Sequence, residues 1–367
     1  MGLRCGIVGL PNVGKSTLFN SLSNAKAESA NYPFCTIEPN VGIITVPDER
    51  LQILEAIVKP ERVVPTIVEF VDIAGLVKGA SKGEGLGNKF LANIREVDAI
   101  IHVVRCFDDP NIVHVAGKVD PVADKEIIDT ELQLKDLESV DKKIAKTERT
   151  AKNGDATAKK ELAALLRYKQ HLEAGKNARS LELLLTDEEK SAVADLLLLT
   201  AKPVIYAANV DEASISTGNP WLEVLKAHVV PENAQVIAIC AAIEAQIAEM
   251  EEPEEKEMFL AEYGLKESGL NRLIRASYDI LNLITYFTAG VKEVRAWTVH
   301  RGDKAPAAAG VIHSDFEKGF IRAEVIKLAD YQNFRSEVKI KEAGKMAVEG
   351  KEYVVQDGDI MHFRFNV

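Results

Sequence analysis

The sequence predicts an α/β protein: a mostly parallel sheet, an inserted α-helical hairpin and a smaller, strand-rich C-terminal region. Three observations lead to this prediction. Short apolar runs alternate with helical stretches in the first part of the chain, and a central segment has only helical spacing. The C-terminal part then changes to short strand-like pieces.

Five apolar runs, each bounded by Gly, Asp, Asn or Pro, are predicted to be buried strands joined by crossover helices. These runs are Cys5–Val8, Ile67–Val71, Ile100–Cys106, Val204–Ala208 and Val236–Ile239. Ligands of such sheets bind beyond the carboxyl ends of the strands. Motifs at those ends therefore carry the functional argument.

The central segment is predicted to be an antiparallel helical hairpin. Leu134, Leu137, Val140 and Ile144 recur at helical spacing, and Asn153-Gly154-Asp155 reads as the turn before a second helix. We predict a sheet domain over residues 1–123 and 200–280, a hairpin over 124–199 and a C-terminal domain over 281–367. A helix is expected near Leu270–Leu283, and the predicted C-terminal strands are Glu293–Val299, Phe320–Val325, Tyr353–Val355 and Ile360–Phe365.

The bulk composition excludes some classes of protein. A formal net charge of -11 over 367 residues argues against tight, non-specific binding of nucleic acid by the protein as a whole. Four scattered cysteines, Cys5, Cys35, Cys106 and Cys240, form no Cys-x-x-Cys pair and fit free thiols in a reducing compartment. We see no signal peptide and no membrane-spanning run, so a cytoplasmic protein without a membrane partner is expected.

A phosphate-binding loop follows the first predicted strand. Gly9-Leu10-Pro11-Asn12-Val13-Gly14-Lys15-Ser16 satisfies the pattern G-x-x-x-x-G-K-[S/T] at every position. The glycines allow a tight turn that aims backbone amides at phosphate oxygens. Lys15 supplies a charge to the β- and γ-phosphates, and the Ser16 hydroxyl suits Mg²⁺. The sequence therefore predicts a P-loop nucleoside-triphosphatase.

Two further segments are predicted to complete the phosphate site. Asp72-Ile73-Ala74-Gly75 ends the second predicted strand, so Asp72 can hold the metal through water and Gly75 can offer its amide to the γ-phosphate. Thr36 lies in a polar segment after the first predicted helix, where a threonine can complete the magnesium shell. A solvated loop threonine is the alternative interpretation of Thr36.

The predicted base site departs from that of guanine-specific proteins. Asn209-Val210-Asp211-Glu212 stands where such proteins carry Asn-Lys-x-Asp, so Val210 replaces the lysine and Glu212 replaces the aspartate that pairs with guanine. Asn209 remains, and a carboxamide can pair with the amino donor and N7 acceptor of adenine. Our hypothesis is a preference for ATP, and a promiscuous site is the alternative.

The hydrolytic group is not evident from the sequence. Leu76 stands where well-studied GTPases place the glutamine that orients water, and leucine does none of that chemistry. Asn12 is a candidate to help coordinate K⁺ beside the phosphates, and His114 is a candidate for proton handling, with a packed or solvent-facing histidine as the alternative. A conventional GTPase and a non-catalytic, nucleotide-gated scaffold both remain open.

The hairpin reverses the sign of the chain's charge. Residues 141–180 hold eleven basic and five acidic residues, a local excess of six positive charges. A basic hairpin is a plausible surface for phosphate-rich RNA, read through charge rather than bases, and a solvated hairpin without a partner is the alternative. On this interpretation, reversing the charges of Lys159 and Lys160 abolishes the salt-dependent binding of such RNA.

These motifs together resemble the YchF/Obg-like ATPase family of P-loop proteins across essentially the whole chain. The resemblance rests on the P-loop, on segments 32–36, 72–80 and 83–88, and on Asn209-Val210-Asp211-Glu212. It implies an Obg-type nucleotide domain, a coiled-coil hairpin and a β-grasp-like C-terminal TGS domain. It also implies slow ATP hydrolysis and association with the ribosome.

The resemblance also assigns residues and partners. It implies nucleotide contacts at Asn12, Val13, Gly14, Lys15, Ser16 and Thr17, with Val210 near the base, and magnesium ligation by Ser16 and Thr36. The implied partners are the large ribosomal subunit or the 70S ribosome, with rRNA or tRNA contacted by the hairpin and the TGS domain. Cys35, beside Thr36, is a conceivable redox group, although a bystander thiol is the better interpretation.

Overall fold

A computed structural model describes residues 3–24, 40–73, 86–114 and 117–366 of the chain. These residues form two compact units. The first contains the described parts of segments 3–24, 40–42 and 69–273, and the second contains residues 43–68 and 274–366. Residues 43–68 therefore pack with the C-terminal part of the chain, a feature that the sequence analysis did not anticipate. The finer division into three domains stays a prediction.

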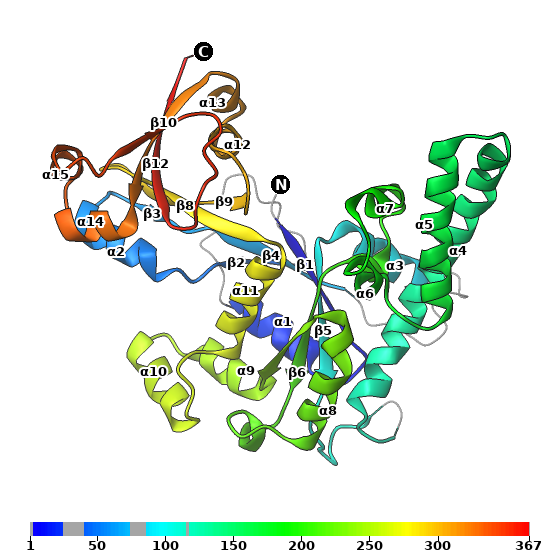
Figure 1. Cartoon of the computed structure of the whole chain (residues 1–367). Helices are drawn as coiled ribbons and strands as arrows, with labels where there is room; N and C mark the ends of the chain where they lie inside the picture. The colour runs from blue at the N-terminus through cyan, green and yellow to red at the C-terminus, as the bar shows by residue number, and fades with distance from the viewer. Residues whose placement is uncertain (1–2, 25–39, 74–85, 115–116, 367) are drawn as a thin grey trace. The chain divides into compact units, whose positions relative to one another are not determined.

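Six strands form the first sheet, in the order β2-β4-β1-β5-β6-β7 (Figure 1). Their bounds are β1 Arg4–Val8, β2 Val41–Thr45, β4 Ile67–Asp72, β5 Ala99–Arg105, β6 Val204–Asn209 and β7 Gln235–Ile239. β1 pairs in parallel with β4 and β5, and β6 pairs in parallel with β5 and β7. Every residue of β5 and β6 is buried, which explains why both strands are mostly apolar. The predicted parallel sheet is confirmed.

Helices connect these strands and follow their carboxyl ends. Their bounds are α1 Lys15–Asn24, α3 Leu86–Glu96, α8 Pro220–Val229, α9 Ala241–Glu249, α10 Pro253–Glu262 and α11 Gly269–Ile280. Because the strands run in parallel, the loops after β1, β5, β6 and β7 lie at one edge of the sheet. The candidate site is built from these four loops.

The predicted helical hairpin is confirmed. Helix α4 (Pro121–Lys152) and helix α5 (Ala156–Glu173) lie side by side, joined by the predicted turn (Figure 1). Asp120 and Asp155 cap the two helices by accepting hydrogen bonds from the backbone N–H groups of Ala123 and Ala158. The hairpin core is made of Val140, Ile144, Leu165, Tyr168 and Leu172, with residues of the segment that follows α5. That segment contains α6 (Ala178–Glu182), α7 (Asp187–Ser191) and the short 3₁₀ turns Ala194–Leu196 and Leu199–Ala201.

The second unit is built on a mixed sheet with the order β11-β10-β12-β8-β9-β3. The strand bounds are β3 Val63–Val64, β8 Leu283–Ala289, β9 Val294–His300, β10 Phe320–Lys327, β11 Ala347–Glu349 and β12 Asp359–Phe365. β12 and β8 pair in parallel, whereas β8 pairs with β9 and β10 pairs with β12 in antiparallel fashion. The helices of this unit are α2 Glu49–Val58, α12 Ala305–Ile312, α13 Ser314–Lys318, α14 Leu328–Phe334 and α15 Glu337–Glu342. This arrangement agrees with the predicted α+β class.

Two apolar clusters stabilise the second unit. One includes Tyr286, Val299 and Ala308, and the other includes Leu54 of α2 and Ile340 of α15. Two sequence predictions were wrong in detail. Segment 353–355 contributes one isolated bridge, Val354 to Lys304, instead of a strand, and the helix expected to reach residue 283 ends at Ile280, where β8 follows. Within the described part of the chain, no helix has the length and apolar character needed to cross a membrane.

Candidate functional site

The phosphate loop lies between β1 and α1. Asn12 and Gly14 adopt positive φ angles of 63° and 92°, so the chain turns sharply before Lys15 begins the helix. A Cβ atom on Gly14 would lie 2.3 Å from Nδ2 of Asn209, and one on Gly9 would lie 2.8 Å from the carbonyl oxygen of Val103. These two positions therefore exclude any side chain. The loop has the backbone shape that cradles phosphate at a helix N-terminus.

Lys15 and Asp72, both predicted site residues, are brought together. The Lys15 ammonium makes an ion pair with the Asp72 carboxylate at the end of β4. Ser16 and Thr17 are exposed in the first turn of α1. The hydroxyl of Ser16 and a carboxylate beside the phosphate loop fit Mg²⁺, which takes few protein ligands and binds mainly phosphate and water oxygens. The predicted residues Thr36 and Gly75, with Leu76 and Cys35, lie outside the described residues.

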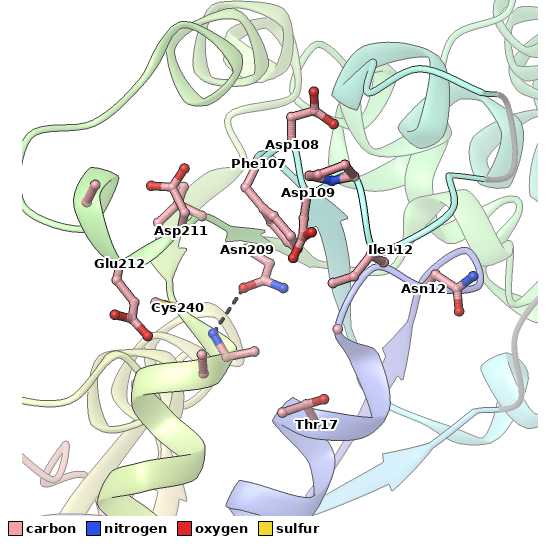
Figure 2. A pocket seen from close by; sticks show the side chains of 16 residues that line it. Asn12, Thr17, Phe107, Asp108, Asp109, Ile112, Asn209, Asp211, Glu212 and Cys240 are labelled. Carbon is pink, nitrogen blue, oxygen red and sulfur yellow. Dashed lines mark hydrogen bonds between the residues drawn. The ribbon is translucent and has the colours of Figure 1, made fainter.

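A cavity of about 650 Å³ adjoins the phosphate loop, a size suited to a nucleotide. Four loops line it, those that follow β1, β5, β6 and β7 (Figure 2). The lining residues include Asn12, Gly14, Thr17, Phe107, Asp109, Ile112, Asn209, Val210, Glu212 and Ala241. The predicted P-loop and base residues therefore face one space.

Asn209 holds two loops of the site together. Its Nδ2 donates to the carbonyl of Val13 at 2.9 Å. Its Oδ1 accepts from the backbone N–H of Ala241 at 3.0 Å (Figure 2). Only 5% of the residue is exposed. Asn209 is therefore a bracket that joins the phosphate loop to the start of α9, and its pairing with adenine stays a prediction.

The residues after Asn209 are also held in place. The Val210 N–H donates to the carbonyl of Ile239 at 2.8 Å, and the Asp211 carboxylate accepts from the N–H of Ser214 at 2.8 Å. The Tyr263 hydroxyl donates to Oε2 of Glu212 at 3.3 Å. The carboxylates of Asp211 and Glu212 thus each accept a hydrogen bond from another group of the protein.

Arg105 is a pocket-forming residue that the sequence analysis missed. It ends β5, is 1% exposed, and its guanidinium donates to the carbonyls of Phe107 at 3.0 Å, Ile112 at 2.9 Å and Asp109 at 3.3 Å. The same guanidinium lies over the Phe107 ring at 4.6 Å from its centroid. Arg105 therefore fixes the loop that forms one wall of the cavity. A lone arginine in an otherwise apolar predicted strand was the available signal, because such a charge is buried only with partners.

His114 lies at the far end of the same loop. Its Nε2 is 2.9 Å from Oδ2 of Asp124 in the first turn of α4, and only 7% of its side chain is exposed. Burial raises the pKa of Asp124, whereas the hydrogen bond with His114 opposes that shift. The preceding residue, Val113, accepts a hydrogen bond from Nδ2 of Asn12 at 3.1 Å. The loop that carries His114 therefore contacts the phosphate loop, and a catalytic role for His114 stays a prediction.

The described cysteines are unsuited to thiolate chemistry. Cys5, Cys106 and Cys240 are buried and free. Burial raises the pKa of Cys106 to about 12 and also raises the pKa of Cys240, which lines the cavity. Among the described residues, no cluster of three or more His, Cys, Asp or Glu side chains is arranged to hold a metal.

The hairpin's positive charge is partly neutralised by the segment that follows it. Lys160 pairs with Glu188 and Arg167 with Glu189, both on α7. Lys169 pairs with Asp141. Extending the charge count from 141–180 to residue 195 adds five acidic residues and one basic residue, so the excess of positive charge falls to two. Lys160 and Glu188 are both largely exposed, whereas Lys159 has no ion-pair partner in the described part of the chain, and the predicted RNA contact of both lysines stays a prediction.

Family models match both ends of the chain. Residues 4–152 match a family described as a 50S ribosome-binding GTPase. Residues 283–366 match a model named for the C-terminal region of YchF GTPases and described as a protein of unknown function. The two matches fall on the phosphate-loop region and on the mixed sheet, respectively.

Curated relatives and solved structures match the full length. "Ribosome-binding ATPase YchF" of Haemophilus ducreyi is 60% identical and that of Bacillus subtilis 58% identical, each with 100% of both chains covered. The structure of the Schizosaccharomyces pombe YchF GTPase has a TM-score of 0.89 and 40% identity, and covers 99% of this chain and 98% of that one. A GTP-binding protein from Pyrococcus horikoshii, at 21% identity and a TM-score of 0.59, shares the fold. The bacterial relatives are named as ATPases and the Schizosaccharomyces pombe protein as a GTPase. The preference between the two bases is therefore argued from the residues of the pocket.

Proposed function

Because this chain belongs to the YchF family, we propose that it is a P-loop ATPase that binds and slowly hydrolyses ATP and associates with the ribosome. One observation supports ATP hydrolysis: residues of the phosphate loop and of the altered base segment line the same cavity. ATP with Mg²⁺ is the nucleotide form that the donor set fits. A cytoplasmic location is part of the same proposal, because a protein that associates with ribosomes is expected where ribosomes work.

The base segment lacks the groups that favour guanine. Guanine recognition needs a carboxylate free to accept from two base N–H groups and an aliphatic lysine stem along the ring. Here Val210 stands in place of the lysine, the Asp211 carboxylate caps its own turn, and Glu212 is hydrogen-bonded by Tyr263. A good bidentate pair is worth about 1–3 kcal/mol, and its absence removes the advantage of guanine.

Nucleotide titration of stripped protein tests the proposal. We expect calorimetry to give tighter binding for ATP than for GTP, and tighter GTP binding would identify a conventional GTPase instead. The paired variant Val210→Lys with Glu212→Asp restores the guanine-type motif and should shift the ATP-to-GTP preference toward GTP by about tenfold or more. The single change Val210→Leu is the matched control, because it alters size without adding the lysine or the aspartate.

For the hydrolytic step, we propose that Asn12 helps hold K⁺ beside the phosphates. Its Nδ2 is occupied by the carbonyl of Val113, which orients the carboxamide and leaves Oδ1 for a cation. The positive charge would take the place of an arginine finger. Turnover should be faster in K⁺ than in Na⁺ at equal ionic strength, and Asn12→Ala should abolish the difference. Equal rates in the two salts would refute this role.

A further inference from the structure

His114 is enclosed by the protein, although the residues just before it reach the nucleotide pocket. Ile112 lines the cavity (Figure 2), and the carbonyl of Val113 accepts the hydrogen bond from Asn12 of the phosphate loop. The side chain of His114 is only 7% exposed and is not among the described residues that line the cavity. A general base must come within hydrogen-bond reach of the proton that it takes. The imidazole therefore has to leave this position before it can act on a water molecule beside the phosphates.

The carboxylate of Asp124 holds His114 in the enclosed position. Its Oδ2 lies 2.9 Å from Nε2 of the imidazole, and its side chain is 3% exposed. Its other oxygen, Oδ1, is buried and has no hydrogen-bond partner among the described residues. A buried carboxylate is tolerated only with a partner, so the release of the imidazole leaves an unfavourable charge behind. This cost favours the enclosed position of His114.

Asp124 is itself fixed, because contacts of its neighbours anchor the start of α4. The backbone N–H of Asp124 donates to the carbonyl of Asp120 at 2.9 Å in the first turn of the helix. The next residue, Lys125, is 3% exposed and makes an ion pair of 2.7 Å with Glu232. The hydroxyl of Tyr206 on β6 donates to the same glutamate at 3.2 Å. Because the helix start is held in this way, the imidazole can move toward the phosphates only by breaking its hydrogen bond with Asp124.

We propose that Asp124 restrains ATP hydrolysis by holding the imidazole of His114 away from the nucleotide. This inference rests on the proposed ATPase function, with His114 as the group that handles the proton. The released imidazole accepts a proton from the attacking water, whose oxygen bonds to the γ-phosphorus. The bond from that phosphorus to the bridging oxygen breaks, and ADP leaves with its electron pair. The rate of hydrolysis then depends on the fraction of molecules in which the hydrogen bond between His114 and Asp124 is broken.

The variant Asp124→Asn tests this role in single-turnover hydrolysis of ATP. The carboxamide has nearly the shape of the carboxylate without its charge, and a charge-assisted hydrogen bond is roughly twice as strong as a neutral one. We expect the variant to hydrolyse bound ATP faster by about fivefold to tenfold. Its Kd for ATP should stay within about twofold of that of the unchanged protein. A role of Asp124 in stability alone would not raise the rate.

The matched control is Asp120→Asn, which removes the same charge from the same end of α4. Asp120 caps the helix by accepting from the N–H of Ala123, and asparagine caps a helix about as well as aspartate does. The hydrogen bond between His114 and Asp124 stays intact in this control, so its rate should equal that of the unchanged protein. The double variant of Asp124→Asn with His114→Ala should be as slow as His114→Ala alone, because the acceleration requires the imidazole.

Chemical labelling measures the release of His114 without relying on hydrolysis. Diethyl pyrocarbonate modifies accessible imidazoles, and mass spectrometry locates the modified residue. In the unchanged protein, His114 should react much more slowly than His313, whose side chain is 60% exposed. The labelling of His114 should become faster in Asp124→Asn. Melting curves show whether that variant folds, and Asp124→Ser, which also lacks the charge, is the second variant with the same expectations.

The outcomes separate this inference from the proposed function. An unchanged or lower rate in a folded Asp124 variant would overturn the inference, and so would labelling of His114 as fast as that of His313 in the unchanged protein. Hydrolysis that His114→Ala leaves intact would also overturn it, while the ATPase function would stand. Absence of ATP hydrolysis by the unchanged protein would refute the proposed function itself.

Discussion

Replacing Asn209 by alanine distinguishes two roles of this residue, holding two loops together and contacting the base. The carboxamide joins the carbonyl of Val13 to the N–H of Ala241 across the floor of the pocket. If Asn209 only holds the phosphate loop in shape, its loss weakens the binding of every nucleoside triphosphate by the same factor. If it also pairs with adenine, its loss weakens the binding of ATP more than that of GTP.

The magnitude follows from the two hydrogen bonds. Removing the carboxamide leaves two backbone groups without a partner, and each costs about 1–3 kcal/mol. A total of about 2–6 kcal/mol is therefore available, shared between folding stability and nucleotide affinity. If all of it appeared in binding, affinity would fall by at least roughly 25-fold.

Calorimetry on Asn209→Ala with ATP and with GTP is the decisive measurement. We expect both affinities to fall together and their ratio to stay within about twofold of that of the unchanged protein. Asn209→Asp is a useful companion, because its carboxylate keeps the acceptor for Ala241 but faces the carbonyl of Val13 without a donor. A loss of affinity confined to ATP would refute a purely structural role of Asn209 and would support its pairing with adenine.

Three further predictions follow from buried groups. Arg105→Met should raise the Kd for ATP by about tenfold or more, because three loop carbonyls lose a charged donor, and unchanged binding would show that the loop orders itself. His114→Ala should slow single-turnover hydrolysis by about a hundredfold with ATP affinity retained if the histidine handles a proton, and equal rates would remove it from the reaction. Burial lowers the pKa of His102 to about 4, so the unfolded chain binds the extra proton first as the pH falls below 6.5. Stability should therefore drop by about 3 kcal/mol between pH 6.5 and 4, and denaturant titrations of His102→Gln should lack that part of the slope.

Much of the fold was predictable because its periodicities are strong. The buried strands β5 and β6 are mostly apolar, and the hairpin has a helical pattern on both sides of one clear turn. The packing of α2 with the C-terminal sheet was not predictable. Leu51 and Leu54 show only that one face of the helix is apolar, and nothing local indicates a sheet more than two hundred residues away as its partner.

The site was predictable to the level of which residues meet, but not of what each one does. The P-loop and the segment after β6 were identified from residue types and lie on one cavity. The hydrogen bonds of Asn209 to two loops were not predictable, because the motif shows a carboxamide but not its partners. The ion pairs of Lys160 and Arg167 were missed because a charge count over 141–180 ends before the acidic residues of α7.

The same physical requirement explains both Asn209 and Arg105. Loops at the end of a parallel sheet bury backbone groups that no strand pairs, and each such group needs a partner. Asn209 serves one donor and one acceptor on two different loops, while Arg105 serves three acceptors on its own loop. These two buried polar residues therefore hold the loops of the site together. Discrimination between bases must come from groups that this scaffold presents, namely the segment Val210–Glu212, the wall around Phe107 and the start of α9. Substitutions there should change which nucleotide binds, whereas substitutions in the brackets should change how tightly all of them bind.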